Sequence, residues 1–183
     1  MKKFEEKTLN TNKIFDGNVI SLQVDEVSLP NGKTSKRELV KHPGAVAIIA
    51  LTKEKELILV EQYRKPLEQS ILEIPAGKIE PNEDPEVTAL RELEEETGYT
   101  TKKLNYITSF YTSPGFADEI IHIYYTDKLK KLAYNVLGDE DEFVELHILN
   151  EEKIKQAFTN KSIYDAKTIY AIQYLEINNL FKK

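Results

Sequence analysis

The strongest chemical signal in the sequence is the run of glutamates in RELEEETG, residues 91–98. Four of the six residues from Arg91 to Glu96 are glutamates, and no lysine is placed to offset their charge. Because helix residues three and four apart share a face, Glu92, Glu95 and Glu96 are expected to point together. Converging carboxylates without His or Cys suit a hard cation, Mg²⁺ or Mn²⁺. Such a cation can bridge a diphosphate and neutralise charge as water attacks.

The residues around this cluster specify a helix that would carry it. Asp84 is a good N-cap, Pro85 suits the first helical position, and Gly98 can take the left-handed conformation after the last turn. Glu94 falls among the apolar positions, and the pattern gives no account of it. The alternative is a solvated acidic face with no ligand. The expected apolar side lies opposite the three glutamates and consists of Val87, Ala89, Leu90 and Leu93.

Length and composition limit the class of protein. A chain of 183 residues with 40% hydrophobic residues suits one domain with a small appendage. A net charge of −6 disfavours a general nucleic-acid binder, and the absence of cysteine excludes disulfides and thiolate chemistry. No apolar segment follows the first lysines, and no stretch approaches the roughly 20 apolar residues of a membrane span. We therefore expect a cytoplasmic protein with no nucleic-acid or membrane partner.

The chain before the helix is organised in strands. Residues 19–29 alternate as a strand does, residues 30–32 form a turn, and residues 34–42 read as the returning strand. Residues 1–42 are therefore predicted to form a small antiparallel unit, and 43–183 the main domain. The apolar runs at 45–51 and 57–64 are predicted to pair as a hairpin. Further strands are expected at 71–75, 104–111, 119–127 and 143–149.

Two helices are expected to close the chain. Asn150 can cap the first, and Asp165 can cap a second that runs to residue 181. Strands dominate, with three helices packed on them, so the predicted fold class is α+β.

At this point the sequence resembles a known family. Gly77, Glu83 and the run Arg91–Tyr99 stand at the spacing of the 23-residue Nudix box, and each fixed position is met. Tyr99 replaces the usual aliphatic residue, which concerns packing rather than chemistry. The resemblance implies a Nudix α/β/α sandwich, with the antiparallel unit added, and metal-dependent hydrolysis of a nucleoside diphosphate linked to another group.

Three further stretches resemble the ADP-ribose pyrophosphatase subfamily: EQYRKPL at 61–67, LEIPAGKIE at 72–80 and SPGFADE at 113–119. Pro114 stands fifteen residues past the box, close to a characteristic proline of that subfamily. The resemblance implies that residues 1–42 build a homodimer and contact substrate, with each site drawing on both chains.

The resemblance also implies roles for individual residues. The Ala76 carbonyl, Glu92 and Glu96 would bind metal, with Glu83 and Glu95 close by. Arg91 would hold the box loop by ion pairs. The residues that match substrate-lining positions are Glu73, Lys78 and Ser113.

Arginine usage gives an independent hint. The chain has only three arginines, Arg37, Arg64 and Arg91, among 25 basic residues. Arginine in such a background suggests a need for a planar, bidentate donor to phosphate or carboxylate. We expect Arg64 and Arg37 to contact the diphosphate or the adenosine half, Arg37 across the dimer. The alternative is that these positions are arginine by chance.

The acidic loop at 139–142 is the last candidate element. By composition it reads as a solvated loop, but the matching subfamily loop carries a water-activating glutamate and a metal ligand. By position, Glu140 resembles the base and Glu142 the ligand, although an alignment shift would exchange them. A carboxylate is a sufficient base for metal-bound water.

The leading hypothesis is hydrolysis of ADP-ribose to AMP and ribose 5-phosphate with Mg²⁺, or Mn²⁺ in its place. One alternative is a Nudix hydrolase for another nucleoside-diphosphate sugar or a dinucleotide. A second is a non-catalytic module that binds ADP-ribose as a regulatory ligand. Such modules typically lose box glutamates. The presence of Glu92, Glu95 and Glu96 in this chain favours catalysis.

Overall fold

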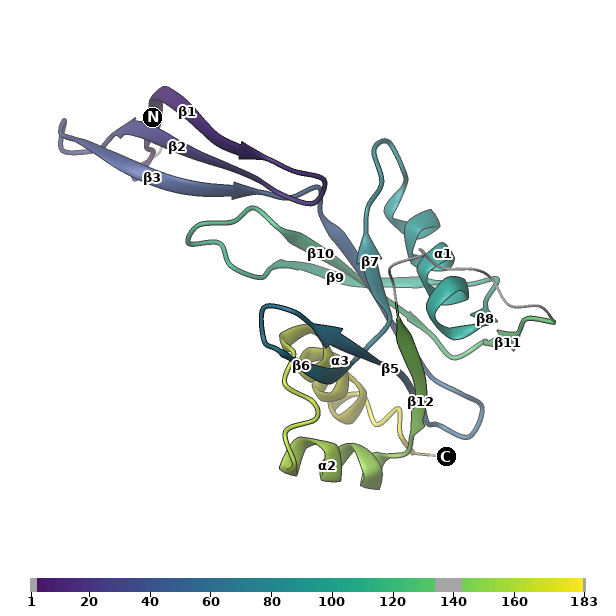
Figure 1. Ribbon diagram of the computed structural model, residues 1–183. Helices are drawn as coiled ribbons and strands as arrows, with labels where there is room; N and C mark the ends of the chain where they lie inside the picture. The colour runs from purple at the N-terminus through teal and green to yellow at the C-terminus, as the bar shows by residue number, and fades with distance from the viewer. Residues whose placement is uncertain (1–2, 134–142, 183) are drawn as a thin grey trace. The chain divides into compact units, whose positions relative to one another are not determined.

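The computed structural model of the protein describes residues 3–133 and 143–182 (Figure 1). The chain divides into two compact units, residues 1–44 with 110–121 and residues 45–109 with 122–183. In the part of the chain that the structure describes, no helix is long and apolar enough to cross a membrane.

The first unit contains a three-stranded antiparallel sheet in the order β1-β2-β3, formed by β1 (Lys7–Asp16), β2 (Ser21–Ser28) and β3 (Thr34–Lys41). The predicted hairpin of β2 and β3 is confirmed, with Ser21 opposite Lys41 and Ser28 opposite Thr34. Strand β1 was not predicted. Its sequence, KTLNTNKIFD, lacks a clean alternation, it is exposed at all ten positions, and two register shifts interrupt its pairing with β2.

The second unit is built on two main sheets. One has the order β7-β4-β10-β9 and the other the order β12-β5-β6. Their strands are β4 (Ala45–Ala50), β5 (Leu57–Arg64), β6 (Gln69–Glu73), β7 (Ala76–Lys78), β9 (Asn105–Tyr111), β10 (Ile120–Thr126) and β12 (Val144–Leu149). Strands β9 and β10 each have residues in both units. A short pair is formed by β8 (Tyr99–Thr100) and β11 (Lys130–Lys131).

The predicted hairpin of β4 with β5 is wrong. The two strands lie in different sheets and share only an isolated bridge between Leu51 and Leu57. The prediction rested on the apolar run of β4. That run reflects burial on both faces of the strand, where five of its six residues are buried. A continuous apolar run shows that a strand is central, but it does not show which strand lies beside it.

Three helices pack on these strands: α1 (Pro85–Thr97), α2 (Glu151–Thr159) and α3 (Ala166–Ile177). Helix α1 packs against β4, β5, β7 and β12, whereas α2 packs against β12 and α3 against β6. Figure 1 shows α1 and the α2–α3 pair on opposite sides of β5 and β12. This α+β arrangement, with strands between helices, confirms the predicted fold class.

The caps of the helices follow the prediction. The side chains of Asp84, Asn150 and Asp165 accept backbone N–H bonds in the first turns of α1, α2 and α3. Gly98 ends α1 with φ of 68°, and its N–H donates to the Glu94 carbonyl over 3.0 Å. Helix α3 ends at Ile177, four residues before the predicted end, because Asn178 caps it and Asn179 turns left-handed with φ of 54°.

One apolar cluster fixes α1 against the sheets. Ala89 and Leu93 are fully buried among side chains of β4, β5 and β10: Val46, Ile48, Ala50, Ile58 and Tyr124. Val87 was expected on this apolar side, but it is 57% exposed. The helix is therefore anchored by a narrower stripe than the sequence predicted, and its other sides are free to carry polar groups.

Candidate active site

Arg91 ties the acidic residues of the box together. Its Nη1 donates to Glu92 at 2.7 Å and to Glu95 at 2.9 Å, while Nε and Nη2 donate to Glu83 at 3.2 and 3.1 Å. Only a planar guanidinium can reach three carboxylates in this way. Hydrogen bonds to Glu83 and Glu95 and the charge of Glu92 raise the pKa of Arg91, and the hydrogen bond from Arg91 lowers the pKa of Glu83.

The short strand β7 covers the acidic side of α1. A Cβ atom on Gly77 would overlap the carboxylate of Glu92, so only glycine lets the backbone approach this closely. One residue earlier, the Ala76 N–H donates to Glu96 over 3.0 Å. Glu92 and Glu96 are therefore both buried, at 6% exposure each, although an acidic face is ordinarily solvated.

Glu94, which the sequence pattern left without a role, has a structural partner. The Thr100 hydroxyl of β8 donates to its Oε1 over 2.5 Å. The bond joins the last turn of α1 to the strand that follows Gly98. Glu94 therefore secures the end of the helix, while Glu92, Glu95 and Glu96 remain with β7 and the cavity described next.

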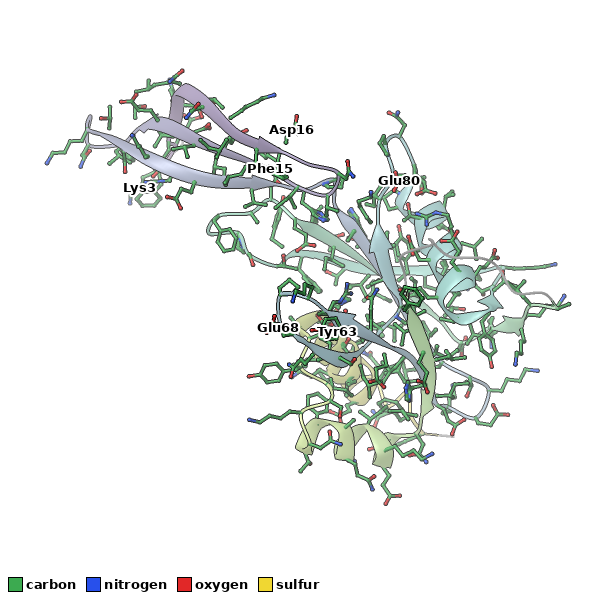
Figure 2. The ribbon with its side chains drawn as sticks, in the orientation of Figure 1. Lys3, Phe15, Asp16, Tyr63, Glu68 and Glu80 are labelled. Atoms are coloured by element: carbon green, nitrogen blue, oxygen red, sulfur yellow. The ribbon has the colours of Figure 1, made fainter. Side chains whose placement is uncertain are left out.

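A cavity of about 440 Å³ lies beside the end of α1. Two of the box glutamates, Glu95 and Glu96, face it, together with two more from β5 and β12. Figure 2 labels Tyr63, one of its aromatic side chains. The complete lining is Glu61, Tyr63, Ser70, Glu95, Glu96, Phe143, Val144 and Glu145.

Sequence reasoning missed the strand residues of this cavity. Glu61 and Tyr63 are two apart on β5 and therefore share a face, which is a signal the sequence does contain. Glu145 stands directly opposite Glu61 in the pairing of β12 with β5, a like-charge pair that is unfavourable on its own. The Nε2 atom of His147 lies 3.1 Å from Glu61, an ion-pair distance without the angle of a hydrogen bond. The register that joins these residues could not be predicted from the sequence.

The donor chemistry of the box fits a hard divalent cation. Its carboxylates offer oxygen only, and the missing Cβ of Gly77 leaves the space that Glu92 occupies. Within residues 3–133 and 143–182, no three Asp, Glu, His or Cys side chains are arranged together as a metal site. Arg91 instead binds Glu92 and Glu95, and Ala76 N–H binds Glu96. The residues that would hold the cation are thus positioned by hydrogen bonds to this chain's own groups.

A second cluster forms around Glu73 at the end of β6. Arg64 donates to it through Nε at 2.6 Å and Nη2 at 2.8 Å, and Lys167 of α3 forms a short ion pair with the same carboxylate. Lys167 also lies 3.1 Å from Asp165, the N-cap of α3. Burial raises the pKa of Glu73, but Arg64 and Lys167 outweigh it, so the pKa lies below its usual value.

The remaining candidates are Lys78, Arg37 and Ser113. Lys78 pairs with Glu80 at 3.1 Å, and its carbonyl accepts a 3.5 Å bond from Arg91. Arg37 belongs to the first unit, where it forms a bidentate pair with Glu6 at 2.6 and 2.8 Å. Ser113, also in that unit, accepts two backbone N–H bonds in a turn through its carbonyl.

Glu140 and Glu142, the expected base and fourth metal ligand, lie outside the described residues.

The fold and the box together define a metal-using hydrolase of the Nudix type. The model of the NUDIX domain matches residues 41–169, which is more than half of the chain. The chain therefore belongs to the Nudix family and is a Nudix hydrolase. Membership of this family implies dependence on a divalent metal ion.

Two similar proteins cover almost the whole chain. The methanol dehydrogenase activator of Bacillus methanolicus is 59% identical over 181 residues, which is 99% of this chain and 98% of that protein. The ADP-ribose pyrophosphatase of Bacillus subtilis is 59% identical over 177 residues, 97% of this chain and 96% of that protein. A crystal structure of an ADP compounds hydrolase has a similar fold, with a TM-score of 0.82 at 19% identity, covering 98% of this chain and 100% of that one.

Proposed function

We propose that this protein hydrolyses the diphosphate of ADP-ribose, with water, to AMP and ribose 5-phosphate. The observation that carries the proposal is the cavity of about 440 Å³ whose wall includes Glu95 and Glu96 of the box. Carboxylates beside a cavity of this size suit a cation and the diphosphate that it binds. The choice of ADP-ribose is supported by the 59% identity to an ADP-ribose pyrophosphatase and by the three stretches at 61–67, 72–80 and 113–119.

Mg²⁺ is the proposed metal, and Mn²⁺ the substitute. The Ala76 carbonyl, Glu92, Glu96 and Glu142 would hold it. When bound, the cation supplies charge neutralisation at the diphosphate and lowers the pKa of a water molecule. The chain's own contribution is to orient its carboxylates: Arg91 fixes Glu92 and Glu95, and β7 fixes Glu96.

Glu140 is the proposed general base, with Glu95 and Arg91 in supporting catalytic roles. Replacement of Glu140 by Gln keeps the shape of the side chain but removes its ability to accept a proton. We expect kcat to fall by about 10²–10⁴-fold with metal affinity unchanged, which is the usual contribution of a positioned base. Near-normal turnover in this variant would assign the base to Glu142 or to a box glutamate.

Arg64, Glu73, Lys78, Ser113 and Arg37 are the proposed substrate contacts. Arg64 is the strongest of them, because its side chain is 39% exposed and the charge of Glu96 acts on it. Replacing it by Lys keeps the charge but loses the bidentate geometry that suits a phosphate. The expected result is a higher KM for ADP-ribose. Unchanged kcat/KM in both Arg64→Lys and Arg37→Lys would contradict the assignment of the two arginines.

We also propose a cytoplasmic homodimer in which residues 1–42 provide the interface. Support comes from β1, which is exposed along its length and presents Leu9, Ile14 and Phe15, each more than half exposed. Exposed apolar side chains on one strand mark an interaction surface. Light scattering on the purified chain measures its mass, and a monomer at micromolar concentration would contradict this proposal.

A second candidate function rests on one observation, the 59% identity over 181 residues to a methanol dehydrogenase activator. The chain would then act on a dehydrogenase. The test is to add the protein, and its Glu96→Gln variant, to a methanol dehydrogenase assay. Acceleration that survives the substitution would separate activation from hydrolysis at the box.

The experiment that tests the main proposal is product analysis. The purified protein is incubated with Mg²⁺ and ADP-ribose, ADP-glucose, GDP-mannose, NADH or a diadenosine polyphosphate, and the products are separated by ion exchange. We expect AMP and ribose 5-phosphate, with ADP-ribose preferred by at least about tenfold in kcat/KM. Preference for another substrate would leave the Nudix chemistry in place and overturn the substrate. Binding of ADP-ribose without hydrolysis of any compound would favour a regulatory module.

A further inference from the structure

The two cations that pair with Glu73 differ in their exposure to solvent, and the proposed reaction does not by itself require this difference. One carboxylate has two cationic partners, Arg64 from β5 and Lys167 from α3. The Arg64 side chain is 39% exposed, whereas those of Lys167 and Glu73 are only 9% and 3% exposed. Arginine can therefore leave this cluster toward solvent, but lysine cannot.

The energetics of that movement depend on Lys167. A buried carboxylate that loses its only cation is strongly destabilised, because it has given up water and gained no partner. With Lys167 in place, Glu73 keeps an ion pair when Arg64 departs. Without Lys167, the departure of Arg64 would leave Glu73 buried and unpaired, so Arg64 would stay.

The position of Lys167 is fixed by the start of α3. Asp165 caps that helix through Thr168, lies 3.1 Å from the Lys167 ammonium, and so places the lysine against Glu73. The Thr168 hydroxyl in turn accepts the Ile74 N–H over 2.9 Å, which joins the helix to the residue after Glu73. These bonds hold Lys167 and Glu73 as one unit, independent of where the Arg64 side chain lies.

We infer that Lys167 is a positioning residue that keeps Glu73 paired and so releases Arg64 to bind the diphosphate of the substrate. The inference rests on the proposed function, which supplies the anion. Lys167 itself does not touch the substrate. Lys167 determines the fraction of molecules in which Arg64 is free of Glu73. The apparent affinity for the substrate is proportional to that fraction.

Arginine NMR tests the release of Arg64 directly, because the chain has only three arginines and hence three Nε–H signals. In the free protein labelled with ¹⁵N-arginine, we expect Lys167→Met to slow the solvent exchange of the Arg64 Nε–H about tenfold relative to wild type. Lys167→Arg should restore the exchange rate. Lys155→Met is the control, because Lys155 also forms an ion pair, 2.6 Å from Glu151, on the neighbouring helix.

Kinetics with ADP-ribose supply the second measurement. Lys167→Met should raise KM about tenfold and leave kcat within about twofold, as loss of binding competence predicts. The double variant Glu73→Gln/Lys167→Met is compared by Arg64 Nε–H exchange in the free protein, which should return to the wild-type rate within about twofold because an amide no longer holds Arg64. General damage to α3 would not be repaired by a second substitution on β6.

Unchanged Nε–H exchange in Lys167→Met, or a double variant in which the Arg64 Nε–H exchanges as slowly as in the single one, would overturn the inference. Failure of the proposed function gives a different result: no AMP from ADP-ribose and no movement of any arginine signal when ADP-ribose is added with EDTA. The exchange rates of the free protein decide the role of Lys167 in that case as well, since they need no substrate.

Discussion

The two arginine clusters of the second unit are built on different charge ratios. Around Arg91, one cation binds three carboxylates, those of Glu83, Glu92 and Glu95. Around Glu73, the two cations Arg64 and Lys167 are matched by two carboxylates, because Lys167 also lies 3.1 Å from Asp165. Both clusters use bidentate or branched hydrogen bonds at 2.6–3.2 Å, so geometry alone does not distinguish them.

The ratio indicates what each cluster can still accept. Excess carboxylate around Arg91 leaves negative charge for a divalent cation, which the box then shares with the substrate. Around Glu73 the charges balance, and Lys167 can keep Glu73 paired while the more exposed Arg64 binds an anion. A diphosphate bound to a metal ion needs both kinds of partner, and the two clusters together supply them.

The largest effect is expected from a box carboxylate. Glu96→Gln keeps the shape of the side chain but removes one negative charge from the proposed metal site. We expect kcat/KM for ADP-ribose to fall on the order of 10³-fold, because the charge that develops in the reaction loses its counter-ion. The control is Glu68→Gln, since Glu68 is an exposed glutamate that pairs with Lys65. Full activity in Glu96→Gln would show that the box does not hold the catalytic cation.

The next effect concerns stability at the Glu73 cluster. Glu73→Gln leaves Arg64 without its carboxylate and Lys167 with Asp165 alone, which should cost about 3 kcal/mol of unfolding free energy near neutral pH. The folded-state pKa of Glu73 lies below its ordinary value, because Arg64 and Lys167 outweigh the effect of burial. Its contribution is therefore fully present above that value and is lost as pH falls through the lower, folded pKa.

Urea unfolding across a pH series measures this difference. The gap between wild type and Glu73→Gln should be constant from about pH 7 to pH 5.5 and should shrink below about pH 4.5. A gap that is independent of pH down to about pH 3 would mean that the pair contributes packing rather than charge.

A smaller effect is expected from the backbone contact that holds Glu92. Gly77→Ala would drive a methyl group into the Glu92 carboxylate, and we expect a loss of about 1–3 kcal/mol in stability with weaker metal binding. Gly115→Ala is the folding control, because a Cβ atom there meets open space. Equal melting temperatures for the two variants would show that β7 moves away from α1 without cost.

The sequence predicted the parts of this site that depend on local spacing. The caps of α1, the shared side of Glu92, Glu95 and Glu96, and the strand–turn–strand of β2 and β3 all follow from neighbours a few residues apart. The pairing of β4 could not be predicted, since an apolar run does not identify the adjacent strand. The cavity wall was missed for the same reason, because Glu145 and Glu61 meet only through the register of β12 with β5.

Lys167 shows most clearly which site residues could not be predicted from the sequence. It is one of many lysines in the chain, and nothing in its neighbourhood marks it as different. Its partner Glu73 lies 94 residues away, so the ion pair exists only after α3 has packed on β6. Arginine was informative because it is rare here, whereas a functional lysine has no such contrast. Sequence therefore identified one member of the Glu73 cluster by rarity and a second by resemblance, but not the third.

The smallest effect is expected from the ion pair next to Arg64 in the sequence. Lys65 and Glu68 lie 2.9 Å apart, close to the 2.6 Å of Arg64 and Glu73, but their side chains are 80% and 73% exposed. Water screens such a pair, so Lys65→Ala should change the unfolding free energy by less than about 0.5 kcal/mol. Urea unfolding in 0.1 M and 1 M NaCl measures it. A loss of unfolding free energy as large as that of Glu73→Gln would show that distance rather than burial sets the strength of these pairs. Burial would then no longer be a reason to expect that Lys167 stays paired with Glu73 when Arg64 leaves.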